Sequence, residues 1–125
     1  MIAEKKTRKI IATCFSKGRR HDFKLFKQSK TSIHPAIKTQ TDTGYQGIQK
    51  LHGNTELPKK RSKKNPLTKA DKRRNQLISS SRVVIENIIR SIKIFRIVAE
   101  KYRNRRKRFS LRFNLIAAIH NLAIK

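Results

Sequence analysis

The chain has 125 residues, of which 33 are lysine or arginine and 7 are aspartate or glutamate, and its net charge is +26. This length allows one domain at most, and the charge predicts a polyanionic partner, because self-repulsion destabilises a compact chain until an anion neutralises it. Nucleic acid is the expected partner, and an anionic membrane surface competes less well because the basic runs are not confined to one face of an amphipathic segment.

The first half of the chain predicts short strands and short helices. Residues 9–15 predict a strand, because the run is apolar and rich in β-branched residues. Residues 21–30 have apolar residues at partly helical spacing and predict a short helix. Residues 36–42 predict a second strand, which Gly44 ends, and residues 45–52 predict a helix of one to two turns.

The second half begins after a basic linker. Residues 58–66 start and end with proline and are dense in charge, so they predict a solvated linker with a short edge strand just before it. The following sequence has no glycine or proline, and Thr68 can cap one long helix that the serines at 79–81 could interrupt. A second helix is predicted over 108–125, where apolar residues on most sides require a packing partner. A basic connector over 101–109 separates the two helices.

These elements predict a mixed α/β fold. We expect a single domain over residues 1–125, with a strand and helix part over residues 9–57, the linker over 58–66 and a helical part over 67–125.

Composition excludes several other kinds of site. Cys14 is the only cysteine, so neither an internal disulfide nor a cysteine-based zinc cluster is expected. The four histidines have no metal-ligand spacing, and each is interpreted as a surface or boundary residue. There is no apolar run of about 18 residues and no apolar core of a signal peptide, so we expect no membrane span and a cytoplasmic location.

A polar stripe on the long helix borders its apolar side. At about 100° per residue, Arg82, Glu86 and Lys93 project within about 40° of one another. The side expected to face the core carries four apolar residues: Ile85, Ile88, Ile92 and Phe95. Either Arg82 and Glu86 form an exposed ion pair worth about 0.3 to 0.5 kcal/mol, or the stripe lines a cleft.

Asp42 lies in the sequence TDTGYQG, residues 41–47, with no charged neighbour. Aspartate often caps a turn through its side chain, which is the simpler interpretation. The alternative is a ligand for a cation that handles phosphate, since hard cations prefer carboxylate oxygens.

The two signals together resemble the DDE type of insertion-sequence transposase. In that family the second catalytic aspartate lies in an Asp-x-Gly-Tyr motif, which matches residues 42–45. The last catalytic residue lies in Tyr-x-x-Arg-x-x-x-Glu-x-x-x-x-x-x-Lys, which matches Arg82, Glu86 and Lys93, with Ser79 in place of the tyrosine. The stretches GRRHDFKLFK, LPKKRSKKNPLTK and LRFNLIAAI are also similar to the family, so the resemblance covers nearly the whole chain.

The resemblance implies a partial ribonuclease-H-like fold with few strands, one long helix carrying the glutamate motif and a C-terminal helix. It implies that Asp42 and Glu86 are catalytic and hold a divalent metal, usually Mg²⁺, for cleavage and transfer of DNA strands. Arg82, Lys93 and Tyr45 are then expected to contact DNA, and the two cations would do so through its phosphates.

The family's first catalytic aspartate lies upstream of the region that matches residues 9–15, and neither Glu4 nor Asp22 replaces it. We therefore expect the C-terminal part of a transposase that acts on transposon ends in the bacterial nucleoid. Alone it is expected to be catalytically incomplete, with unpaired strand edges and an uncovered apolar helix face, and to depend on an upstream fragment or an intact transposase. Two alternatives remain open: a small basic, non-enzymatic nucleic-acid-binding protein, and a truncated inhibitor that occupies the DNA ends of an intact transposase.

Overall fold

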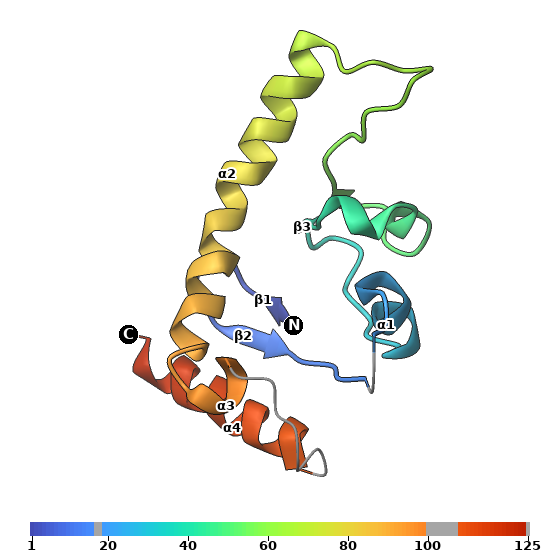
Figure 1. Cartoon of the computed structure of the whole chain (residues 1–125). Coiled ribbons are helices and arrows are strands. Elements are labelled where there is room, and N and C mark those ends of the chain that lie inside the picture. Colours follow the sequence, from blue (N-terminus) through green and yellow to red (C-terminus); the bar gives the residue numbers. More distant parts are fainter. Residues whose placement is uncertain (17–18, 100–107, 125) are drawn as a thin grey trace. The chain divides into compact units, whose positions relative to one another are not determined.

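A computed structural model describes three stretches of the chain, residues 1–16, 19–99 and 108–124 (Figure 1). Helices and short strands both occur in them, so the predicted mixed α/β character is confirmed. The predicted basic connector lies, up to residue 107, outside the described residues. Within the three stretches, no helix combines the length and the apolar character that crossing a membrane requires.

The chain folds into two compact units. The first contains residues 1–15 and 83–125, and the second contains residues 16–82. The long helix α2, Lys69–Ile92, contributes to both.

An antiparallel strand pair opens the first unit. Strand β1, Ile2–Ala3, pairs with β2, Ile10–Ala12, and Ala3 lies opposite Ile10. The Ile10 amide donates to Asn121 Oδ1 at 2.7 Å, and Asn121 Nδ2 donates to the Ile10 carbonyl at 2.8 Å. The Asn121 side chain therefore satisfies the backbone groups that a further strand would otherwise pair.

The core of the first unit joins β2 to the end of α2 and to α4, Phe109–Ala123. Its buried residues come from all three elements: Ile10, Ile88, Ile92, Ile116 and Ala117. Ile85 packs against them, so the predicted core side of the long helix is confirmed at its three isoleucines.

Phe95 departs from that prediction. It is 39% exposed and lies between α2, which ends at Ile92, and α3, Arg96–Ala99. The helical projection no longer applies once the helix has ended, so the prediction that Phe95 faces the core is wrong.

The outer side of α4 is apolar and exposed. Large apolar side chains recur there at helical spacing: Leu111, Leu115, Ile119 and Leu122. This helix therefore has an exposed apolar face, and that another part of the fold would cover such a face stays a prediction.

The second unit begins with α1, Asp22–Gln28, whose first turn is capped by the His21 ring. Its strands β3, Thr39–Gln40, and β4, Thr55–Glu56, pair in parallel, with Thr39 opposite Thr55. These strands confirm the ones predicted within residues 36–42 and just before the linker, although both are shorter than expected.

Two 3₁₀ helices replace the helix predicted over residues 45–52. They are η1, Thr43–Tyr45, and η2, Ile48–Lys50. Gly47 separates them with a φ of 86°, a left-handed conformation that favours glycine and ends a right-handed helix.

His52 is buried between the strands and the segment before them. It is 7% exposed, its Nδ1 lies 3.0 Å from Thr55 Oγ1, and its Nε2 lies 3.2 Å from the His34 carbonyl oxygen. The interpretation of His52 as a surface or boundary residue is therefore wrong. These polar partners let the ring be buried without leaving a nitrogen unpaired.

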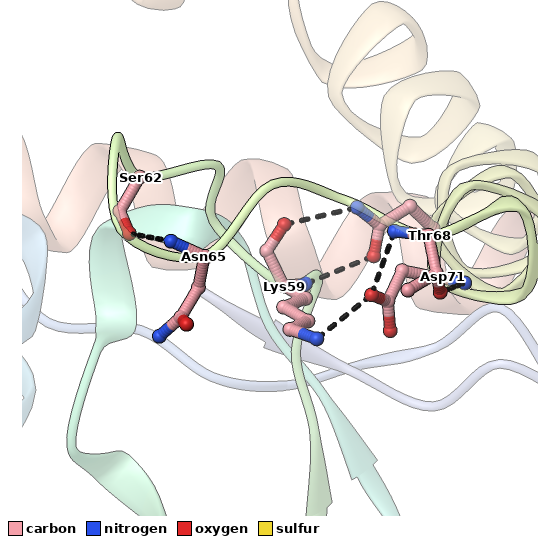
Figure 2. A network of polar contacts seen from close by, with 6 residues as sticks. Lys59, Ser62, Asn65, Thr68 and Asp71 are labelled. Carbon is pink, nitrogen blue, oxygen red and sulfur yellow. Dashed lines mark hydrogen bonds and ion pairs between the residues drawn. The ribbon is translucent and has the colours of Figure 1, made fainter.

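The start of α2 follows its sequence signal closely. The Asp71 amide donates to Thr68 Oγ1 at 3.1 Å, and the Thr68 amide donates to Asp71 Oδ2 at 3.1 Å (Figure 2). This reciprocal pair is a capping box, and it confirms Thr68 as the cap. The helix runs through the serines at 79–81 without a break, and the Ser80 hydroxyl donates to the Leu77 carbonyl at 2.8 Å instead of interrupting the helix.

Candidate functional site

Asp42 directly caps η1 after the end of β3. Its Oδ1 accepts hydrogen bonds from the Thr43 amide at 2.5 Å and from the Thr43 hydroxyl at 3.1 Å. The turn-capping interpretation of Asp42 is therefore confirmed. Capping uses one carboxylate oxygen and leaves the other available for a second role.

Arg82 lies beside the same carboxylate. Its Nη1 is 3.4 Å from Asp42 Oδ1, and the two side chains are 34% and 50% exposed. That distance is longer than the roughly 2.7 to 2.9 Å of a strong charge-assisted bond, and an exposed pair of this kind contributes about 0 to 1 kcal/mol. The contact is loose enough for either group to take another partner.

The second carboxylate oxygen of Asp42, Oδ2, has no hydrogen-bond or ion-pair partner in the described part of the second unit. The contacts of the Asp42 side chain there all fall on Oδ1. The residue is exposed, so Oδ2 is open to solvent and to a bound ion.

A chain of polar contacts joins Ser81, the residue before Arg82, to β3 and β4. The Ser81 hydroxyl lies 2.5 Å from Gln40 Oε1, and Gln40 Nε2 donates to Glu56 Oε2 at 3.1 Å. Lys38 pairs with the other Glu56 oxygen at 2.9 Å. The hydrogen bonds from Lys38 and then Gln40 lower the pKa of Glu56 below its ordinary value, so this carboxylate stays charged at neutral pH.

Tyr45 faces α1. Its ring centroid lies 5.7 Å from that of Phe23 and 6.4 Å from that of Phe26, an aromatic cluster within the second unit. Partial burial raises the pKa of Tyr45, and the nearby carboxylates of Asp22 and Asp42 raise it further. The phenol is therefore neutral at physiological pH. The Tyr45 ring packs against these two phenylalanines, and this packing is the main role that the structure shows for the residue.

Glu86 and Lys93 belong to the first unit, whereas Asp42 and Arg82 belong to the second. Both Glu86 and Lys93 are exposed, and Lys93 lies one residue past the end of α2. Its amide still donates to the Ile89 carbonyl at 3.0 Å, which prolongs the helical bonding by one residue. The roles of the two residues in catalysis and DNA binding stay predictions.

The ion pair expected between Arg82 and Glu86 is replaced. Among the described residues, the ion pair of Arg82 is with Asp42, 40 positions earlier in the chain, and Glu86 has none. No group of three or more histidine, cysteine, aspartate or glutamate side chains gathers in the described stretches in a way that could hold a metal ion.

Sequence reasoning missed the residues that position this site. Gln40 and Ser81 join the strand to the helix, and Glu56 extends the contact to β4. A signal existed for Gln40, which precedes Asp42 by two residues and so projects to the same side of an extended strand. Nothing local in the sequence indicated Ser81, whose partner is 41 positions away.

Comparison with known proteins agrees with the motifs. The model of the DDE superfamily endonuclease family matches residues 2–121. The probable transposase for insertion sequence element IS702 of Microchaete diplosiphon is 44% identical over 127 residues, covering 100% of this chain and 46% of that relative. This chain thus spans less than half the length of the relative. No solved structure matches the chain.

The two matches confirm the resemblance to DDE-type insertion-sequence transposases. The family match extends over almost every residue, including both halves of the motif set. The alignment with the relative covers the whole chain, and its 44% identity far exceeds what the motifs alone would contribute. The chain therefore belongs to the DDE superfamily endonucleases.

Proposed function

We propose that this chain supplies two carboxylates, Asp42 and Glu86, to the metal site of a transposase that cleaves and joins DNA strands. Members of the superfamily generally use a divalent metal and act on DNA. The observation that carries the proposal is the 3.4 Å contact between Arg82 and Asp42, because it joins residues from both halves of the motif set across 40 positions. Contact between these two motif residues supports the proposal, because the proposed site requires both of them near the same phosphate.

The donor chemistry of the proposed site fits a hard divalent cation. Asp42 offers a solvent-open oxygen, Oδ2, and Glu86 is exposed on the helix that carries Arg82. Carboxylate oxygens are the protein ligands that Mg²⁺ prefers, and such ions activate an attacking hydroxyl and stabilise the leaving oxygen of a phosphodiester.

Arg82 is the residue proposed to hold a DNA phosphate beside Asp42. Its guanidinium lies 3.4 Å from the Asp42 carboxylate, and this loose pairing leaves N–H groups for a phosphate. Lys93 is proposed to contact the DNA backbone, and Tyr45 to support the Asp42 turn through its contacts with α1.

Asp42 and Glu86 by themselves do not complete the proposed metal site. We propose that a third carboxylate comes from another stretch of polypeptide, within a ribonuclease-H-like arrangement. The chain alone is then expected to show no nicking of terminal-repeat DNA with Mg²⁺ above an Asp42→Ala control. Clear nicking that depends on Asp42 would mean that two carboxylates suffice.

Metal binding tests the proposal without relying on activity. We would titrate the chain with Mn²⁺ and follow the free ion by electron paramagnetic resonance. Asp42→Asn and Glu86→Gln are each expected to weaken the same class of site, because each removes one charged ligand. Asp71→Asn and Glu4→Gln are the matched controls, one in each unit, and are expected to leave it unchanged.

Either of two results would contradict the proposal. The motif variants could bind Mn²⁺ as the unmodified chain does, or the control variants could lose as much binding as the motif variants. Both results would indicate diffuse binding to carboxylates in general. No observation in the described residues favours the non-enzymatic alternative.

A further inference from the structure

The segment from residue 57 to residue 82 concentrates positive charge in the second unit. Its exposed cations come from the loop before α2 and from the first turns of that helix: Lys59, Lys60, Arg61, Lys63, Lys64, Lys69, Lys72, Arg73 and Arg74. Asp71 is the only acidic residue in this stretch. A loop with this many like charges would normally extend into solvent, because its cations repel one another.

The loop is instead held against the helix (Figure 2). Lys59 Nζ pairs with Asp71 Oδ2 at 2.7 Å. Asn75 Oδ1 accepts from the Lys59 amide at 2.9 Å, and Asn75 Nδ2 donates to the Lys59 carbonyl at 3.0 Å. Further along the loop, the Asn65 amide donates to Ser62 Oγ at 3.0 Å, which forms a local turn. The loop therefore has a defined start and a defined turn despite its charge.

The helix presents its own cations on the side away from these contacts. At about 100° per residue, Lys69, Lys72 and Arg73 project within about 100° of one another. Asp71, Asn75 and Ile78, which are less exposed, project at about 180° to 240° from Lys69, so Lys69 and Arg73 lie roughly opposite them and Lys72 lies at the border, about 60° from Asn75. The polar contacts to the loop and the buried isoleucine thus orient the basic stripe toward solvent.

We propose that the exposed cations of this segment form a second DNA-binding surface, separate from the motif residues, that binds the phosphates of duplex DNA without reading sequence. The surface, called the basic surface below, comprises these residues: Lys60, Arg61, Lys63, Lys64, Lys69, Lys72 and Arg73. The choice of DNA as the partner rests on the proposed function.

Three features favour a duplex backbone as the ligand. Residues 57 to 82 contain no phenylalanine, tyrosine or tryptophan, so the segment offers no platform on which single-stranded bases could stack. The capping box satisfies the Thr68 and Asp71 amides and places the Asp71 carboxylate at the start of α2, which favours binding of the phosphates by side-chain cations over binding by helix amides. Lys69 and Arg73 are about 6 Å apart along the helix axis, a span of about two phosphates of one strand.

A membrane surface fits the same segment less well. A helix that lies on a membrane needs an exposed apolar side with bulky residues next to its basic side. Here Ile78 is 3% exposed and so offers no apolar side chain to a membrane. Leu77 is the exposed large apolar residue of the described helix between residues 69 and 82.

The salt dependence of DNA binding tests the basic surface. We would measure the affinity for a mixed-sequence duplex by fluorescence anisotropy at about 50 to 200 mM salt, with EDTA present. The triple variant Lys69→Gln, Lys72→Gln, Arg73→Gln is expected to reduce the slope of log K against log salt by about 2 to 3, since each phosphate contact contributes about 0.9. Its affinity should fall about 10-fold or more near 100 mM salt.

A second triple variant with the same change of charge is the control. Lys24→Gln, Lys30→Gln, Lys50→Gln removes three exposed cations of the same unit outside the basic surface. It should change the slope by less than about 1. Circular dichroism of both triples checks that the helices persist. Equal losses in both triples would overturn the proposal, because they would show that only net charge matters.

Two further results would also overturn it. The first is an unchanged slope in the surface triple. The second is that this triple loses binding to vesicles containing phosphatidylserine but keeps its slope on DNA, which would make the segment a membrane surface. Because EDTA removes the metal, these results are independent of the Mn²⁺ titration. Failure of the metal site and failure of the basic surface can therefore be told apart.

A substitution that keeps every charge tests whether the held loop matters. Asn75→Ala removes both hydrogen bonds to the Lys59 backbone, and Gln76→Ala alters the exposed neighbour as a control. The Asn75 variant should bind the duplex several-fold more weakly with an unchanged salt slope, because the loop must then be ordered on binding. Binding as tight as that of the Gln76 variant would show that the loop contributes charge only.

Discussion

The side chain of Asn121 is predicted to be a main support of the first unit. Its two hydrogen bonds, at 2.7 and 2.8 Å, satisfy the amide and the carbonyl of Ile10, a residue that is 7% exposed. In Asn121→Ala both backbone groups stay partly buried and lose their partner. Each such group costs about 1 to 3 kcal/mol, so we expect the free energy of unfolding to fall by roughly 2 to 4 kcal/mol.

Asn114→Ala is a closely matched control. Asn114 lies two turns earlier on nearly the same side of α4, and its Oδ1 accepts a hydrogen bond of 2.5 Å from the Thr13 hydroxyl. Because that bond is exposed, both groups can return to water, and the loss should be about 0.5 kcal/mol or less. The two variants share residue type and helix, and they differ in the number of hydrogen bonds lost, two against one, and in the burial of the partner.

Urea unfolding followed by circular dichroism measures the stability of both variants. Hydrogen exchange at the Ile10 amide, followed by NMR, reports locally on the same contact and should accelerate only in the Asn121 variant. If both asparagines cost the same, or if the Ile10 amide exchanges at its original rate in Asn121→Ala, the assignment of Asn121 as a substitute for a neighbouring strand is refuted.

Two further predictions concern the second unit. Hydrogen bonds from Lys59 and then the Thr68 amide lower the pKa of Asp71 from 3.8 to about 2, and the pKa of Glu56 lies below its ordinary 4.5. As the pH falls, these carboxyl groups take up protons in the unfolded chain before they do so in the folded chain. The stability that they contribute is complete above about pH 4.5 and should be lost progressively toward pH 2. Urea midpoints measured across this pH range test the prediction. Asp71→Asn should flatten that dependence, and a profile as steep as before would contradict the assignment. Gly47→Ala should destabilise the unit by about 1 kcal/mol because of its left-handed backbone, whereas Gly53→Ala, with equal space and no positive φ, should have little effect in thermal unfolding.

Local sequence signals predicted most elements, although the strands are shorter than expected. The cap at Thr68 and the core isoleucines of the long helix were confirmed, because a capping box and a helical repeat involve residues only three or four positions apart. The errors arose where a local rule stopped applying. Phe95 lies past the end of its helix, and Gly47 divides the helix predicted over residues 45–52.

The motif residues and the family could be read from the sequence, because their identity and spacing are properties of the chain itself. The charge of +26 also predicted a polyanionic partner, and that prediction does not depend on the fold. Only the tertiary structure decided what those residues touch. It directed Arg82 to Asp42 and away from Glu86, buried His52 among polar partners, and held the basic loop against α2 through Asn75. Such contacts join residues far apart in the chain, so they depend on how whole elements pack, which no local pattern encodes.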